Sequence, residues 1–238
     1  MVIQKKKKFR DKCSTVSFIN LELFLRNMID KKDFEGLKQE LEDYDKARDH
    51  VISKSNEIVK LSKVIIYSVQ REELNLNREI SEMRKKIIEL REIKGDLRQE
   101  GSYKVAIQEY VEAMTFYEII KNGKLPTRAQ LKVNAEDYLM GLCDLTGELL
   151  RKAMNYAIYK RYTDVFRIKE LVSDIYYYFL RLNLRNSELR KKSDAIKYNL
   201  RKIEDVVFEL KLREIPLDRK REQRDEETSI RIKKKTED

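Results

Sequence analysis

The sequence predicts an all-α protein, a bundle of about seven long helices, and three observations support this. Only 6 glycines and 2 prolines occur in 238 residues, which leaves little material for the turns of a many-stranded sheet. Charged residues make up 39% of the chain and hydrophobic residues 41%, a mixture that suits helices with charged outer faces around an apolar core. Apolar residues also recur every three or four positions over most of the chain, as they do along one face of a helix.

The chain has a formal net charge of +10. Such an excess of basic residues indicates a polyanionic partner, either a nucleic acid or an anionic membrane surface. No apolar run approaches the roughly 20 residues that a membrane-spanning helix needs. The basic start of the chain is not followed by the apolar segment of a signal peptide, and the 2 cysteines have neither disulfide nor zinc-ligand spacing. We therefore expect an intracellular, cytoplasmic protein without a membrane partner.

Three segments are expected along the chain, namely a basic tail over residues 1–13, a helical domain over residues 14–215 and a charged tail over residues 216–238. The domain contains no internal repeat. Its apolar stripe is not one uninterrupted heptad array, which favours a compact bundle over an extended coiled coil.

The apolar pattern predicts three helices in the first part of the domain. The first covers about residues 14–31. A second, long helix starts at Asp33, which can cap it, and continues to Val69. The third extends to Leu97, and a break is expected at Gly101.

Four further helices are predicted in the second part. The fourth covers residues 102–122 and stops at Gly123, because glycine favours the position after a helix C-terminus. Asn134 opens the fifth helix, since asparagine is a good N-cap and an acid follows three residues later. Thr163 is expected to cap the sixth helix, and the seventh is expected to end before Pro216.

Two acid pairs at helical spacing are the most informative feature of the sequence. Glu109 and Glu112 lie three residues apart, so they share one face of the fourth helix. Val105, Phe116 and Ile119 continue this face, so the two acids occupy positions that the pattern otherwise gives to apolar residues. A carboxylate in such a position is costly unless a cation or a proton compensates its charge.

The second pair, Asp144 and Glu148, lies four residues apart on the fifth helix. Two helices packed at about 8–10 Å could bring all four carboxylates together. Clustered oxygen ligands suit a hard divalent ion such as Mg²⁺ or Mn²⁺, which can activate water and neutralise charge at a phosphodiester. The alternative is that the acids are solvated or salt-bridged, as most acid pairs in a highly charged chain are.

Five basic residues before the first acid pair are candidates for binding a nucleic-acid backbone. Arg84, Arg91 and Arg98 recur every seven residues along the third predicted helix, so each step advances roughly 10 Å. Lys94 lies beside them, and Lys104 follows shortly before the acids. Acids are interleaved in the same stretch, so the alternative is an ion-paired, solvated face. The net charge favours RNA or DNA, bound by charge and shape.

The residues around both acid pairs resemble the translin family, in particular its translin-associated factor X branch. Residues 108–120 resemble the acid-bearing helix of that branch, and residues 137–151 resemble the next long helix of the family. Residues 181–214 resemble the C-terminal helix of translin itself, which lacks the acids, and residues 44–73 are less closely similar to the N-terminal helices. The resemblance covers roughly residues 35–214.

This resemblance implies a seven-helix fold that assembles into an octameric shell and binds RNA and single-stranded DNA on its inner surface. The catalytic branch is a Mg²⁺-dependent endoribonuclease whose acids correspond here to Glu109, Glu112 and Asp144, with Glu148 as a fourth contributor. We therefore predict a homo-oligomeric endoribonuclease that uses Mg²⁺ or Mn²⁺ and cleaves RNA inside a helical shell. The alternatives are a non-catalytic shell that binds single-stranded DNA or RNA, and a helical scaffold whose charge is only solvating.

Overall fold

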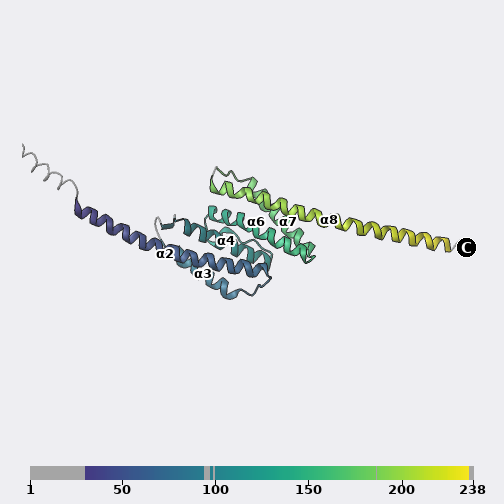
Figure 1. Cartoon of the computed structure of the whole chain (residues 1–238), viewed down its shortest axis with the longest axis horizontal. Helices are drawn as coiled ribbons and strands as arrows, with labels where there is room; N and C mark the ends of the chain where they lie inside the picture. The colour runs from purple at the N-terminus through teal and green to yellow at the C-terminus, as the bar shows by residue number, and fades with distance from the viewer. Residues whose placement is uncertain (1–29, 94–96, 99, 186, 236–238) are drawn as a thin grey trace, which may run out of the picture. The chain divides into compact units, whose positions relative to one another are not determined.

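The computed structural model describes residues 30–93, 97–98, 100–185 and 187–235. This part of the chain contains seven helices and no strand, which confirms the predicted all-α fold (Figure 1). The basic N-terminal tail, all but the end of the first predicted helix, and Lys94 lie outside the described residues. No helix within the described ranges is both long and apolar enough to cross a membrane.

The chain divides into two compact units, Met1–His50 and Val51–Asp238. The described part of the first unit is the N-terminal portion of helix α2 (Lys31–Gln70). Asp30 caps this helix, because its Oδ1 accepts a 2.9 Å hydrogen bond from the backbone N–H of Lys32. The prediction that Asp33 caps the helix is therefore wrong. Asp33 lies in the first turn, where its negative charge interacts favourably with the helix dipole.

The second unit is built around α6 (Ala135–Ile158), which lies between α4 (Gly101–Asn122) and α8 (Glu188–Lys235) and also packs against α7 (Tyr162–Leu180) (Figure 1). Ion pairs link α2 to α3 (Asn77–Arg91), with 2.6 Å between Lys54 Nζ and Glu89 Oε2. Some of the acids interleaved in α3 are thus salt-bridged, as the alternative interpretation expected. The largest fully buried apolar side chains of the shared core include Ile58, Ile65, Met83, Ile87, Leu90, Phe116, Leu145, Leu149, Ile196 and Ile203.

Helices α4 and α6, which carry the two acid pairs, begin and end close to their predicted positions. Gly123 ends α4 in the left-handed conformation, with φ of 66°, and its N–H donates to Ile119 O over 2.9 Å. Asn134 caps α6 by accepting a 2.8 Å hydrogen bond from the backbone N–H of Asp137. The break expected at Gly101 lies before this residue, because α3 ends at Arg91 and Gly101 is already the first residue of α4.

Helix α3 ends at Arg91, so the prediction that it continues to Leu97 is wrong. The Arg98 side chain donates hydrogen bonds of 2.7 Å to the backbone oxygens of Arg91 and Ile93, which satisfies carbonyls left unpaired at the end of the helix. The apolar pattern also does not predict the short helix α5 (Arg128–Leu131), which starts with a capping box between Thr127 and Gln130.

The last two helices differ from prediction at one end each. Helix α7 begins at Tyr162 with Arg161 at the N-cap position, so Thr163 is not its cap. Helix α8 continues through Pro216 to Lys235 and does not end before the proline. A proline within a helix removes one backbone hydrogen bond, at about 3 kcal/mol or more, and kinks a helix without always ending it. The boundary of the charged tail at residue 216 stays a prediction.

Candidate functional site

Helices α4 and α6 approach each other closely at Gly141. A Cβ at this position would lie 2.6 Å from Val111 Cβ and 2.9 Å from Gln108 O, so a side chain does not fit there. Val111 directly precedes Glu112, and Asp144 lies about one helical turn after Gly141. The close approach therefore brings one acid of each pair to the same level of the two helices.

Glu112 is the most deeply buried of the four acids, with an exposed fraction of 8%. Within the described part of the chain, its carboxyl group forms no hydrogen bond or ion pair. Burial raises the pKa of Glu112 to about 8, and the charges of Asp144, Glu109 and Glu148 contribute to the rise. The four acids thus lie within range of one another's charge, and we refer to them as the acidic cluster.

Two lysines supply positive charge to the cluster. Burial raises the pKa of Glu109, while Lys63 of α2 opposes the rise. Burial also raises the pKa of Asp144. Lys192 of α8 partly offsets this rise through a 2.5 Å contact between its Nζ and Asp144 Oδ2. Sequence reasoning missed both lysines, because they belong to helices whose packing against α4 and α6 is set by the tertiary structure.

Glu148 is held by the C-terminal end of α2. The Nε2 of Gln70, the last residue of this helix, donates to Glu148 Oε2 over 2.8 Å and to Glu148 O over 2.9 Å. The ammonium group of Lys152, whose exposed fraction is only 1%, donates to the backbone oxygens of Val69 and Gln70 over 3.0 Å each. Lys152 therefore fixes the helix end that positions Gln70 against Glu148.

Among the described residues, no three acidic, histidine or cysteine side chains are placed to hold a metal ion as they stand. Asp144 is paired with Lys192, and Glu148 accepts a hydrogen bond from Gln70. The chemistry of the donor set nevertheless fits a hard cation, because every ligand would be a carboxylate oxygen and the buried Glu112 has no partner among these residues. Cation binding thus requires a rearrangement in which Asp144 releases Lys192.

The predicted basic residues do not form one row. Arg98 lies beyond the end of α3, and Lys94 lies outside the described residues. Arg84 and Arg91 line a cavity that also contacts Tyr110 of α4. At 3.6 residues per turn, Tyr110 lies roughly 160° around the helix from Glu112. This cavity therefore opens on the side of α4 that faces away from the acidic cluster.

A second cavity, of about 740 Å³, lies near the N-terminal ends of α4 and α6, and none of the four acids of the cluster lines it. Arg98 and Lys104 line it, and Arg91 borders both this cavity and the first one. The second cavity extends to Gln108, whose Oε1 accepts a 3.4 Å hydrogen bond from Lys192. Of the predicted basic residues, Arg98 and Lys104 thus line this cavity and not the first one.

The fold and this site define a class of protein, an all-α bundle that holds a partly buried carboxylate cluster between two of its helices. The model of the translin family matches residues 46–214, and the chain belongs to the translin family. The matched range contains both acid pairs and Lys192. The family resemblance predicted from the sequence is confirmed.

Relatives match different shares of the chain. Translin of Gallus gallus is 40% identical over 81 residues. This match spans only 34% of this chain and 35% of the chicken protein. Translin-associated protein X of Mus musculus is 27% identical over 230 residues, 77% of this chain and 79% of the relative. An uncharacterized protein of Methanocaldococcus jannaschii is 26% identical over 179 residues, 71% of this chain and 81% of the relative.

Solved structures with the same fold are C3PO proteins. The crystal structure of apo-NeC3PO superposes with a TM-score of 0.67 at 27% identity, covering 76% of this chain and 98% of that one. The structure of an AfC3PO–duplex RNA complex also gives a TM-score of 0.67, at 22% identity, covering 77% of this chain and 98% of that one. Because the sequence identity to AfC3PO is only 22%, this similarity shows a common fold and nothing more.

Proposed function

We propose that this chain is a metal-dependent endoribonuclease of the translin family that binds and cleaves RNA at the acidic cluster. The observation that carries the proposal is Glu112, a buried carboxyl group without a partner among the described residues and within range of three other acids. Clustered buried carboxylates destabilise a fold unless a cation or protons compensate them, and a bound divalent ion would compensate several of these carboxylates at once. The similarity to translin-associated protein X, over 77% of this chain and 79% of that protein, supports the same function.

The cation we propose is Mg²⁺, with Mn²⁺ as the alternative, because both prefer carboxylate oxygens. Glu109, Glu112 and Asp144 would hold it, and Glu148 would be a fourth ligand or a base beside it. When bound, such an ion activates water and neutralises charge on a phosphodiester. Without it, the Glu112 carboxyl keeps its proton at neutral pH, because its pKa is raised to about 8. Glu112 therefore gives up a proton when the cation binds.

Basic side chains on the second cavity, which extends to Gln108 next to Glu109, would hold the RNA backbone. Arg98 and Lys104 line this cavity, and Arg91 borders it. Phosphate contacts of this kind depend on charge and shape, so binding is expected to weaken steeply with salt. The positively charged chain, with a net charge of +10, favours the same partner.

Glu112→Gln and Asp144→Asn are each expected to lower Mg²⁺-dependent RNA cleavage at least about 100-fold, because each removes one carboxylate ligand. The measurement is cleavage of labelled RNA with and without Mg²⁺, together with RNA binding in EDTA, which both variants should retain. Glu118→Gln is the matched control, since Glu118 lies on the same helix α4 but outside the acidic cluster and should be removable without loss of activity.

Two results would contradict the proposal. If both cluster variants cleave RNA as the wild type does, the acids are not the catalytic site. If the wild type binds RNA or single-stranded DNA but never cleaves with Mg²⁺ or Mn²⁺, the protein is a non-catalytic binding protein. The ion pair between Lys192 and Asp144 is the observation that favours this second function, because it compensates one acid without a metal.

We also propose that the chain forms a homo-oligomer, an octamer by its family resemblance. Large apolar side chains at the surface of the single chain support assembly, because monomeric proteins rarely leave many of them exposed. Ile158 is 73% exposed, Tyr178 64% and Phe208 61%. Light scattering is expected to give a particle of eight times the chain mass of 28.6 kDa. A monomer at micromolar concentration would contradict this expectation.

A further inference from the structure

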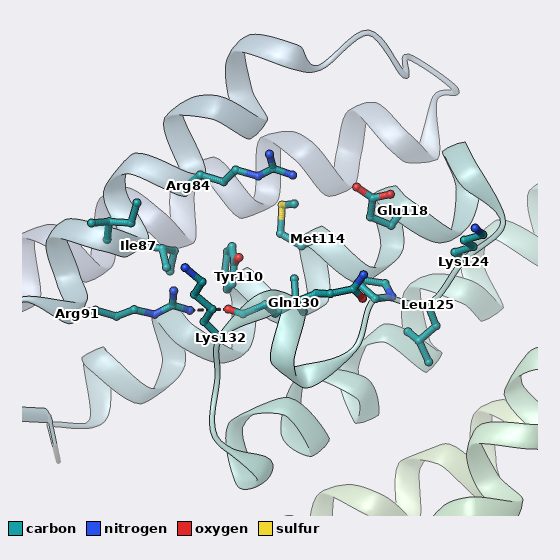
Figure 2. A pocket seen from close by; sticks show the side chains of 13 residues that line it. Arg84, Ile87, Arg91, Tyr110, Met114, Glu118, Lys124, Leu125, Gln130 and Lys132 are labelled. Carbon is teal, nitrogen blue, oxygen red and sulfur yellow. Dashed lines mark hydrogen bonds between the residues drawn. The ribbon is translucent and has the colours of Figure 1, made fainter.

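The cavity on the far side of α4 has the size and lining of a small-molecule site. Its volume is about 420 Å³, within the range of roughly 300–1,000 Å³ that small-molecule sites occupy. Helices α3, α4 and the segment 124–132 around α5 enclose it (Figure 2). The apolar part of its lining consists of Ile87, Ile88, Tyr110, Met114, Leu125, Pro126 and Leu131.

Basic side chains surround this apolar lining. Arg84, Lys124 and Lys132 line the cavity, and within the described residues none of their side chains forms a hydrogen bond or an ion pair. Glu118 is the single acid in the lining, and it already accepts a 2.6 Å hydrogen bond from Asn122 Nδ2. The cavity therefore holds unused donors and an excess of positive charge, which favours an anionic group.

Two features fix the basic groups at the cavity wall. Arg91 donates a 2.7 Å hydrogen bond to Leu131 O, and its guanidinium lies 5.7 Å from the ring centroid of Tyr110. Figure 2 shows Arg91 and Lys132 on the side of the cavity where Tyr110 lies. Lys132 has a φ of 53°, a left-handed conformation that usually selects glycine or asparagine. Glycine or asparagine at position 132 would relieve this backbone strain. The chain instead has a lysine there, which places a long cationic side chain at the cavity wall.

We infer that this cavity binds a nucleoside monophosphate group, with the phosphate between Arg84, Arg91 and Lys132 and the base against the apolar lining. A bare phosphate would use only the basic groups and would leave the apolar lining uncovered, while an uncharged nucleoside would leave the donors unpaired. The group can belong to a free mononucleotide or to a 5′-phosphorylated RNA end. This site goes beyond the proposed nuclease function, because it lies across α4 from the acidic cluster. It shares Arg91 and Lys132 with the wall of the second cavity, while Arg84 lines this cavity and not the second one.

The first test is isothermal titration calorimetry of the full chain in EDTA at low salt, with AMP, adenosine and inorganic phosphate as separate ligands. AMP is expected to bind at least about tenfold more tightly than adenosine or phosphate, because a charge-assisted hydrogen bond is worth at least one factor of ten. Equal affinities for AMP and adenosine, or no binding of AMP at millimolar concentration, would overturn the inference.

Variants then locate the site. Arg84→Gln and Lys132→Asn are each expected to weaken AMP binding at least about tenfold, and asparagine tolerates the backbone conformation at position 132. Arg78→Gln is the matched control, because it makes the same charge change on the same helix α3 outside the cavity lining. AMP affinity that is unchanged in both cavity variants, or lowered equally in the control, would overturn the assignment.

Competition separates the two sources of the ligand. A 5′-phosphorylated oligoribonucleotide that displaces AMP, when its 5′-hydroxyl counterpart does not, identifies an RNA end. An oligonucleotide that leaves AMP bound identifies a free mononucleotide, and both results support the site. Glu112→Gln should bind AMP as the wild type does, so the failure of the proposed nuclease function would leave this result unchanged.

Discussion

Gly141→Ala is expected to lower the free energy of unfolding by roughly 2–3 kcal/mol, as overpacking in a close helix contact does. The added methyl group would lie 2.6 Å from Val111 Cβ and 2.9 Å from Gln108 O, and neither atom can swing away as the end of a flexible side chain could. Relief requires α4 and α6 to move apart. This movement would separate Glu112 from Asp144, so loss of RNA cleavage should accompany the loss of stability.

Gly147→Ala provides the matched control on the same helix. A Cβ at position 147 would meet only Asn199 Nδ2 at 3.8 Å, an ordinary contact. Because alanine favours a helix over glycine by roughly 1 kcal/mol, this variant should be as stable as the wild type or more stable. Urea unfolding of both variants measures the change in the free energy of unfolding, which should be negative for Gly141→Ala and zero or positive for Gly147→Ala. A Gly141→Ala protein as stable as the wild type would show that the close approach is not what sets the helix spacing.

Glu112→Gln is expected to raise the stability of the metal-free protein at alkaline pH by up to about 4–5 kcal/mol. The pKa of Glu112 is raised from 4.5 to about 8, so between these pH values the folded protein holds a proton that the unfolded chain releases. The free energy of unfolding therefore falls as pH rises from about 4.5 to about 8. Glutamine carries no such proton, so the variant should match the wild type near pH 4.5 and exceed it near pH 8.5.

Unfolding in EDTA at both pH values measures this difference, and Mg²⁺ gives a second readout. The ion should stabilise the wild type at pH 8.5 more than Glu112→Gln, because binding to the folded state alone adds stability. Glu118→Gln, which removes a carboxylate charge on the same helix outside the acidic cluster, should give no gain at pH 8.5. A wild-type stability that does not change between pH 5 and pH 8.5 would contradict the expected role of burial.

Local patterns predicted the parts of the fold whose signals lie within a few residues. The end of α4 at Gly123 and the start of α6 at Asn134 depend on a glycine conformation and on a side-chain cap, so both could be predicted from the sequence. The end of α3 could not, because Arg98 satisfies its last carbonyls from outside the helix. The passage of α8 through Pro216 also could not, because a proline alone favours a helix end.

The acid pairs illustrate the same division. The sequence by itself determined that the chain is helical and basic and that each acid pair shares one helix face, because these properties follow from composition and from the period of 3.6 residues. Only the tertiary structure decided that Gly141 brings the pairs together, that Lys192 neutralises Asp144 and that Gln70, 78 residues earlier, holds Glu148. It also placed Arg84 across α4 from the acids. Contacts between residues so distant in sequence depend on how the helices pack, which no local pattern contains.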